Sequence, residues 1–142
     1  MKPFLFSIIT LLSTVVFGQN EIKWKFGYDA NSQEVIATAL LEKDWHVYSI
    51  LPNEGGPVPT SFVFKKSAIY ELKGGIIEPE PTQVYDENFA TTVQFFSNEV
   101  TFKQPIQIKN EGTIEGSVVY MICNDQMCFP PEEVLFSISI TK

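Results

Sequence analysis

The stretch IKWKFGY, residues 22–28, places an apolar side chain at every second position, with lysine or glycine between them. Such a period of two is typical of a β-strand that has one buried and one exposed face. The same alternation recurs in VLFSISI, residues 134–140. No segment after residue 19 shows a sustained apolar period of 3.6, so we expect strands and no helical layer.

Further β-rich runs lie between these two stretches, and turn-forming segments rich in proline, glycine and asparagine separate them. The runs are EVIATALL, WHVYSI, TSFVF, IYEL, VQFF, VTFKQPIQI and GSVVYMI. Short strands about ten residues apart predict an all-β fold, an immunoglobulin-like antiparallel β-sandwich. We expect PEPTQVYDENFATT, residues 79–92, to be a loop.

Residues 1–19 have the layout of a secretory signal peptide. Lys2 precedes an apolar run over residues 4–17, which is followed by Gly18 and Gln19. The run is shorter than the roughly 20 apolar residues that cross a bilayer as a helix. We therefore expect cleavage near Gln19 and a periplasmic or secreted domain of residues 20–142 that does not insert into the membrane. An N-terminal membrane anchor is the alternative.

The charge of the chain argues against a nucleic-acid partner. It has 17 acidic and 10 basic residues, a formal net charge of −7, and it contains no arginine. Phosphate backbones are bound by clustered lysine and arginine, and anionic membrane surfaces attract the same side chains. The composition predicts neither kind of partner.

The stretch YMICNDQMCFPP, residues 120–131, holds the only two cysteines, Cys123 and Cys128. They flank a polar turn, NDQM, and facing residues of a hairpin lie close enough for a disulfide. In an exported protein such a pair can be a structural staple or a redox pair. A bridge over so short a loop stabilises by only about 2 kcal/mol. The residues alone leave these two interpretations open.

A metal site fits the composition poorly. Structural zinc needs four ligands, and this chain offers one cysteine pair and a single histidine, His46. We therefore expect no bound metal, and we expect no other cofactor.

The segment GSVVYMICNDQMCFPPEEVLFSI resembles the cysteine hairpin of the N-terminal periplasmic domain of the DsbD thiol:disulfide interchange proteins. The residues that carry the resemblance are Tyr120, the two cysteines, and Phe129 with the two prolines after it. The resemblance implies that Cys128 is the attacking thiol, which forms mixed disulfides with partners. It implies that Cys123 is the resolving thiol.

Two other stretches are similar to the same family. DENFATTVQFFSNEVTFKQPI resembles its cap-loop region, which places Phe89 over the cysteines with Glu87 just before it. DWHVYS resembles an early strand that brings two aromatic hydroxyls near the cysteines, and here those positions are His46 and Tyr48. Tyr120 and Phe129 are expected near the site as well.

The chain departs from the family pattern at several positions. Four residues separate the cysteines, where the best-known members have five, and His46 replaces a tyrosine. One acidic residue before the cap phenylalanine is Asn88 here. These changes affect the tuning of the thiol pKa values more than the exchange chemistry.

The resemblance implies a function in thiol:disulfide exchange. The domain would receive electrons from a thioredoxin-like donor and pass them to oxidised proteins, such as a disulfide isomerase or a cytochrome c maturation thioredoxin. Its activity would be of the protein-disulfide reductase type and would depend on the donor. The alternative is an immunoglobulin-like binding or accessory domain with a structural disulfide and no redox turnover.

Overall fold

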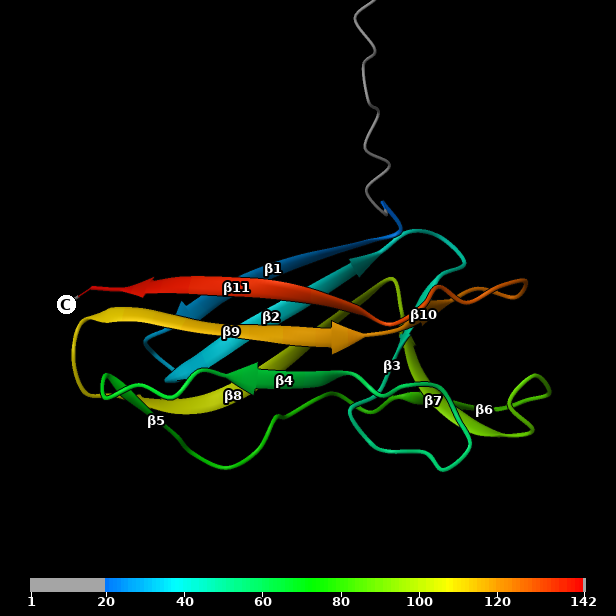
Figure 1. Ribbon diagram of the computed structural model, residues 1–142, viewed down its shortest axis with the longest axis horizontal. Helices are drawn as coiled ribbons and strands as arrows, with labels where there is room; N and C mark the ends of the chain where they lie inside the picture. The colour runs from blue at the N-terminus through cyan, green and yellow to red at the C-terminus, as the bar shows by residue number, and fades with distance from the viewer. Residues whose placement is uncertain (1–19, 142) are drawn as a thin grey trace, which may run out of the picture.

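The computed structural model describes residues 20–141, and all of their regular elements are β-strands (Figure 1). The predicted signal peptide lies outside this described part of the chain. All paired strands run antiparallel, which confirms the all-β expectation. Within residues 20–141, no helix is long and apolar enough to span a membrane.

One layer of the sandwich is a sheet in the order β1-β2-β8-β5. Its strands are β1 (Ile22–Asp29), β2 (Glu34–Leu41), β8 (Glu99–Ile108) and β5 (Tyr70–Leu72). The predicted alternation of β1 is present, because Ile22 is buried while Lys23 and Lys25 are exposed. The rings of β1 face small residues across the ladder: Trp24 lies opposite Ala39. The small neighbour leaves room for the large ring in the interior.

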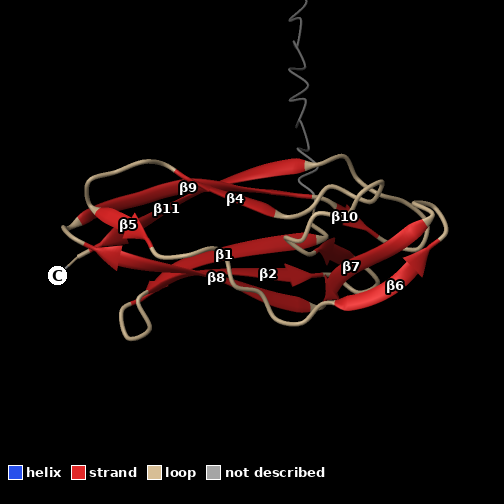
Figure 2. Ribbon diagram, turned by 90° about the horizontal axis from the view of Figure 1, so that it is seen from below, coloured by secondary structure: helices blue, strands red, loops and turns tan. Residues whose placement is uncertain are grey.

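The facing layer has the order β11-β9-β4 and lies over the first sheet (Figure 2). Its strands are β4 (Ser61–Phe64), β9 (Gly112–Tyr120) and β11 (Glu132–Ile140). Phe26 of one layer stacks on Phe136 of the other with ring centroids 4.7 Å apart. Phe102, which is 1% exposed, joins the core between the layers. This is the immunoglobulin-like sandwich that the sequence predicts.

A third sheet, in the order β10-β3-β7-β6, forms one end of the molecule (Figure 1). Its strands are β3 (His46–Tyr48), β6 (Thr82–Asp86), β7 (Thr91–Ser97) and β10 (Ile122–Cys123). The chain leaves the β9 sheet after Tyr120 and enters this end sheet at Ile122. The cysteine hairpin therefore follows almost directly after β9, whose buried residues belong to the core.

The expectation of a loop over residues 79–92 is wrong in part, because β6 lies within it. Four of the five residues of this edge strand are exposed, so it shows no apolar alternation. Its pairing with β7 depends on backbone hydrogen bonds, which leave no signal in the sequence.

The two faces of the end sheet differ in character. Val47 pairs with Phe96 on one side and with Ile122 on the other, and all three belong to the main core. Side chains alternate along a strand, so the neighbouring positions point to the opposite face. That outer face carries His46 and Cys123, which lie directly opposite each other.

Candidate functional site

The turn between the cysteines is fixed by Asn124. Its side-chain oxygen accepts hydrogen bonds from the backbone N–H groups of Gln126, at 2.9 Å, and Met127, at 2.8 Å. Its own N–H donates to the carbonyl of Met127 at 2.9 Å. Cys123 and Cys128 form a disulfide across this turn. The predicted pairing and the predicted turn are both confirmed.

Phe129 attaches the far side of the hairpin to the body of the domain. Its N–H donates to the carbonyl of Ile122 at 3.0 Å. Its ring stacks on Trp45 with centroids 4.8 Å apart and an interplanar angle of 17°. Together, these contacts hold the chain immediately after Cys128.

The two sulfur-bearing residues have very different access to solvent. Cys123 is 2% exposed, whereas Cys128 lies in the exposed turn. A thiolate on another protein can therefore reach Cys128 without opening the core. Attack there would expel Cys123 as the leaving group.

Tyr48 and Val93 pack with Cys123 in a small apolar cluster on the outer face of the end sheet. The Tyr48 hydroxyl and Nε2 of His46 are 3.1 Å apart and share a hydrogen bond. Burial raises the pKa of Tyr48, and the negative charge of Asp86 adds to this rise, so its hydroxyl stays protonated. The strand beneath is held in place because the Thr60 hydroxyl donates to the Tyr48 carbonyl at 2.6 Å.

The turn after β6 carries Phe89 onto this cluster. Asp86 forms its base, and a carboxylate oxygen accepts the N–H groups of Asn88, at 2.8 Å, and Phe89, at 3.3 Å. The Phe89 ring meets Tyr48 edge to face, with centroids 6.4 Å apart. Ala90 then adopts a left-handed backbone conformation with φ of 52°, which is uncommon for a residue other than glycine. The phenylalanine covers the buried cysteine's surroundings and leaves Cys128 exposed.

A cleft of about 420 Å³ opens beside the hairpin on the same face. Val93 and Phe95 contribute its apolar lining. Val84 and Tyr85 of β6 also line it. The polar lining consists of Asp44, His46, Asp86, Glu87, Asn88, Ser97, Asn124 and Asp125. The cleft therefore joins the turn that bears the cysteines to the turn that bears Phe89. Among residues 20–141, no cluster of three or more histidine, cysteine and acidic side chains is arranged to hold a metal ion.

His46 is the residue lining this cleft whose pKa departs from its ordinary value. Burial lowers the pKa of His46 below its ordinary value of 6.5, while the carboxylates of Asp125 and Asp86 act in the opposite direction. The ring lies against Phe95 with centroids 4.6 Å apart. At neutral pH the imidazole is therefore mostly uncharged and able to accept a proton.

The structure brings four of the expected residues together: His46, Tyr48, Phe89 and Cys123. Glu87 is exposed and lines the cleft. Phe129 lies behind the hairpin, as described above.

Tyr120 differs from the expectation, because its ring lies in the main core and not beside the disulfide. Its hydroxyl donates to Glu132 at 2.9 Å, and burial is the main cause of the raised pKa of Tyr120. Closeness in sequence to Cys123 was misleading, because the chain changes sheets at Met121.

Sequence reasoning missed the roles of Asp125, Phe95 and Trp45. Asp125 belongs to the predicted NDQM turn, and its carboxylate also acts electrostatically on His46. Phe95 could have been found from the alternation of β7, because it shares a face with Val93 in the cluster. No pattern in the sequence indicates that Trp45 stacks on Phe129.

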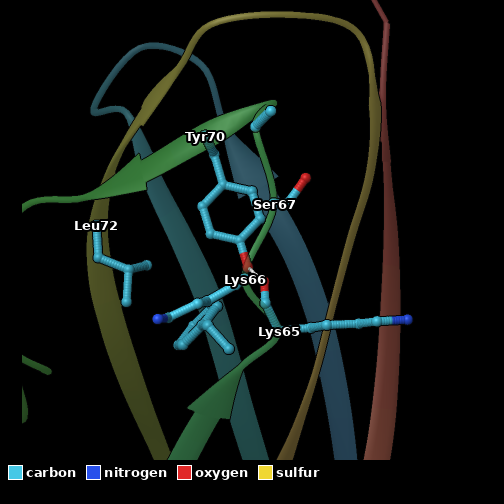
Figure 3. Close-up of a pocket in the computed structure, with 7 residues that line it drawn as sticks. Lys65, Lys66, Ser67, Tyr70 and Leu72 are labelled. Atoms are coloured by element: carbon cyan, nitrogen blue, oxygen red, sulfur yellow. Dashed lines mark hydrogen bonds between the residues drawn. The ribbon is translucent and has the colours of Figure 1, made fainter.

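A second hollow, at the opposite end of the sandwich, has none of this chemistry (Figures 1 and 3). It is lined by Lys65, Lys66 and Tyr70 among others. The Tyr70 hydroxyl donates to the Lys65 carbonyl, and burial raises the pKa of Tyr70. The hydroxyl is occupied by this bond and is a poor acid or base, so we assign no function to this hollow.

Comparison with known families agrees with the geometry of the hairpin. Residues 15–140 match the family described as thiol:disulfide interchange protein DsbD, N-terminal. The chain belongs to this family. No curated protein matches the chain in sequence.

Solved structures show the same fold at low sequence identity. The N-terminal domain of DsbD from Neisseria meningitidis, in its reduced form, has a TM-score of 0.65 at 14% identity, covering 86% of this chain and 87% of that one. The complex of the DsbD and PilB N-terminal domains from the same organism has a TM-score of 0.64 at 10% sequence identity, and the match covers 87% of this chain and 87% of that one. The N-terminal periplasmic domain of ScsB from Proteus mirabilis has a TM-score of 0.56 at 18% sequence identity, and the match covers 83% of this chain and 45% of that one.

Proposed function

We propose that this domain is a thiol:disulfide exchange module that relays reducing equivalents from a thioredoxin-like donor to oxidised partner proteins through Cys123 and Cys128. The observation that carries the proposal is the uneven access to the disulfide, with Cys128 exposed and Cys123 2% exposed. Membership of the DsbD N-terminal family supports it.

The proposed exchange has two half-reactions. A thiolate of the donor attacks Sγ of Cys128, the disulfide breaks, and Cys123 leaves with the electron pair as a thiolate. A second donor thiol then attacks the donor's own sulfur in the mixed disulfide and releases Cys128 reduced. In the other half-reaction Cys128 attacks an oxidised partner, and Cys123 resolves the mixed disulfide, so the partner leaves as a dithiol.

The partners and the location belong to the same proposal. A relative with this fold is known in complex with the PilB N-terminal domain, which supports a thioredoxin-like docking partner. Another relative is a periplasmic domain, and the predicted signal peptide agrees with export. Suitable acceptors would be a disulfide isomerase or a cytochrome c maturation thioredoxin. The activity would be that of a protein-disulfide reductase that depends on its donor.

Trapping tests the roles of the two cysteines. With Cys123→Ala, we expect Cys128 to hold partners as mixed disulfides in periplasmic extracts, because no resolving thiol remains. Cys128→Ala is the matched control and should trap nothing, since its remaining thiol is buried. Equal trapping by both variants, or by neither, would count against the assignment.

The reduction potential tests whether the pair turns over at all. Equilibration with glutathione buffers should give a value above about −300 mV, since inert structural disulfides lie below that value. A lower potential would favour the alternative of a binding domain with a structural disulfide.

Phe89 is proposed to restrict access to the reduced Cys123 thiol. Its contact with the Tyr48–Cys123 cluster supports this role. Phe89→Ala should therefore speed alkylation of the reduced Cys123 thiol, as followed by mass spectrometry. Leu135→Ala is the control, because Leu135 is 78% exposed on β11, away from the cleft, and should leave the rate unchanged. Identical rates in both variants would remove the cover from the mechanism.

A further inference from the structure

The buried position of Cys123 creates a demand for a proton acceptor. To resolve a mixed disulfide at Cys128, the Cys123 thiol must lose its proton, because the thiolate is the nucleophile. Cys123 is 2% exposed and packs against Tyr48 and Val93, and apolar surroundings raise the pKa of a thiol. Bulk water has little access to this sulfur, so a neighbouring side chain has to take the proton.

The register of the end sheet places one such side chain next to Cys123. His46 on β3 is the direct cross-strand partner of Cys123 on β10. Side chains directly opposite each other on antiparallel strands project from the same face, with Cβ atoms about 4.5–5.5 Å apart. His46 is half-buried, and it lines the open cleft, so it can exchange protons with solvent.

The surroundings of His46 are suited to a base at neutral pH. The Tyr48 hydroxyl bonds to Nε2 and restrains the ring, and Phe95 packs against its side. Asp125 on the cysteine turn and Asp86 on β6 act on it electrostatically. The other charged groups of the cleft are Asp44 and Glu87, and no lysine is among the residues that line it. These carboxylates would stabilise the imidazolium once a proton arrives.

We propose that His46 is the general base that accepts the proton of Cys123 when this thiol resolves a mixed disulfide at Cys128. The inference rests on the proposed exchange function. Because Nε2 is engaged by the Tyr48 hydroxyl, the Cys123 thiol gives its proton to Nδ1 of the imidazole, and the resulting thiolate attacks Sγ of Cys128. The bond between Cys128 and the partner breaks, and the partner's sulfur leaves as a thiolate. The imidazolium then returns the proton to that thiolate or to water in the cleft.

The test separates the two thiol steps with the small disulfide reagent DTNB in place of a partner protein. Attack by Cys128 releases a first equivalent of thionitrobenzoate, and resolution by Cys123 releases a second. Stopped-flow absorbance follows both phases in the reduced protein from about pH 5.5 to about pH 8.5, which spans the ordinary pKa values of histidine and cysteine.

In the unsubstituted protein, the second phase should accelerate with pH as His46 loses its proton and then level off before the thiol itself titrates. His46→Gln retains a polar side chain that can bond to Tyr48. Its second phase should rise about tenfold per pH unit, as free thiolate does, and be slower at neutral pH by about 10²-fold. An unchanged rate and profile in His46→Gln would overturn the proposal.

A second pair of variants keeps His46 in place. Asp125→Asn removes a carboxylate that raises the pKa of His46, so the inflection of the second phase should move to lower pH. Glu34→Gln makes the same change of charge at the start of β2, opposite Asp29, and should not move it. An inflection that stays in place in Asp125→Asn would show that another group is titrating and would also overturn the proposal.

The outcome for the exchange function is read separately. If the inflection follows His46 but no thioredoxin-like protein exchanges disulfides with the domain, the relay fails and the base assignment stands. If partners exchange normally while His46→Gln behaves like the unsubstituted protein, the relay stands and the base assignment fails.

Discussion

The two-layer sandwich and the end sheet are built from similar strands, but they differ in which sheet faces are buried in the core. In the sandwich, aromatic rings fill the space between the layers: Phe102 contacts Trp24 and Phe62, with ring centroids 6.0 and 5.4 Å apart. In the end sheet, only one face joins that core. The other face carries the titratable groups and the disulfide. We therefore expect the sandwich core to supply most of the stability and the outer face of the end sheet to carry the proposed chemistry.

This separation is consistent with the proposed exchange function. Opening a disulfide that crosslinked the two layers would loosen the core at every turnover. The bridge between Cys123 and Cys128 instead spans a short turn, and Asn124 and Phe129 still hold that turn by hydrogen bonds that do not involve sulfur. We therefore expect the domain to keep its fold when the disulfide is reduced.

The strongest test of the comparison is Phe102→Ala. Phe102 is 1% exposed in the core, and truncating a buried phenylalanine costs about 3–5 kcal/mol of unfolding free energy. Denaturant unfolding of the oxidised protein measures this loss. Leu135→Ala, at a side chain that is 78% exposed, should change stability by no more than about 0.5 kcal/mol. If the two variants unfolded alike, the core would not be where stability is concentrated.

Removing the disulfide should have a smaller effect. Cys123→Ala combined with Cys128→Ala should lower the unfolding free energy by about 2 kcal/mol, because the closed loop is short. Met127→Ala, on the same turn and 50% exposed, should have almost no effect on the unfolding free energy. Complete unfolding of the double variant would contradict the view that chemistry and stability are separate.

The smallest effect concerns pH. The pKa of His46 is lowered in the folded protein, so the unfolded chain binds more protons as pH falls through the histidine range. This contribution to stability is therefore present above about pH 6.5 and lost below it. Unfolding free energies at two pH values on either side should fall more on acidification than they do in His46→Gln. An equal fall in both proteins would mean that His46 does not contribute.

Most of the fold could be predicted because its strands alternate. Buried and exposed positions in β1 and β11 follow a period of two, and that period follows directly from strand geometry. The strand β6 could not be predicted, since it is exposed along most of its length and depends on β7 for its pairing.

The candidate site was predictable only in part. The cysteine pair and its turn are evident from residue types, and the family resemblance indicated His46, Tyr48 and Phe89. The sequence does not state the register that sets His46 opposite Cys123, because strand pairing depends on the whole fold. The sequence also does not show that the chain passes to the end sheet after Tyr120, which leaves the Tyr120 ring in the main core.

The stack of Trp45 on Phe129 has a spectroscopic consequence. The chain has two tryptophans, Trp24 inside the sandwich and Trp45 behind the cysteine hairpin. Each region thus contains its own intrinsic fluorophore. With Trp24 replaced by phenylalanine, the emission of the remaining indole should report the position of the hairpin during the proposed exchange at Cys128, without any attached dye.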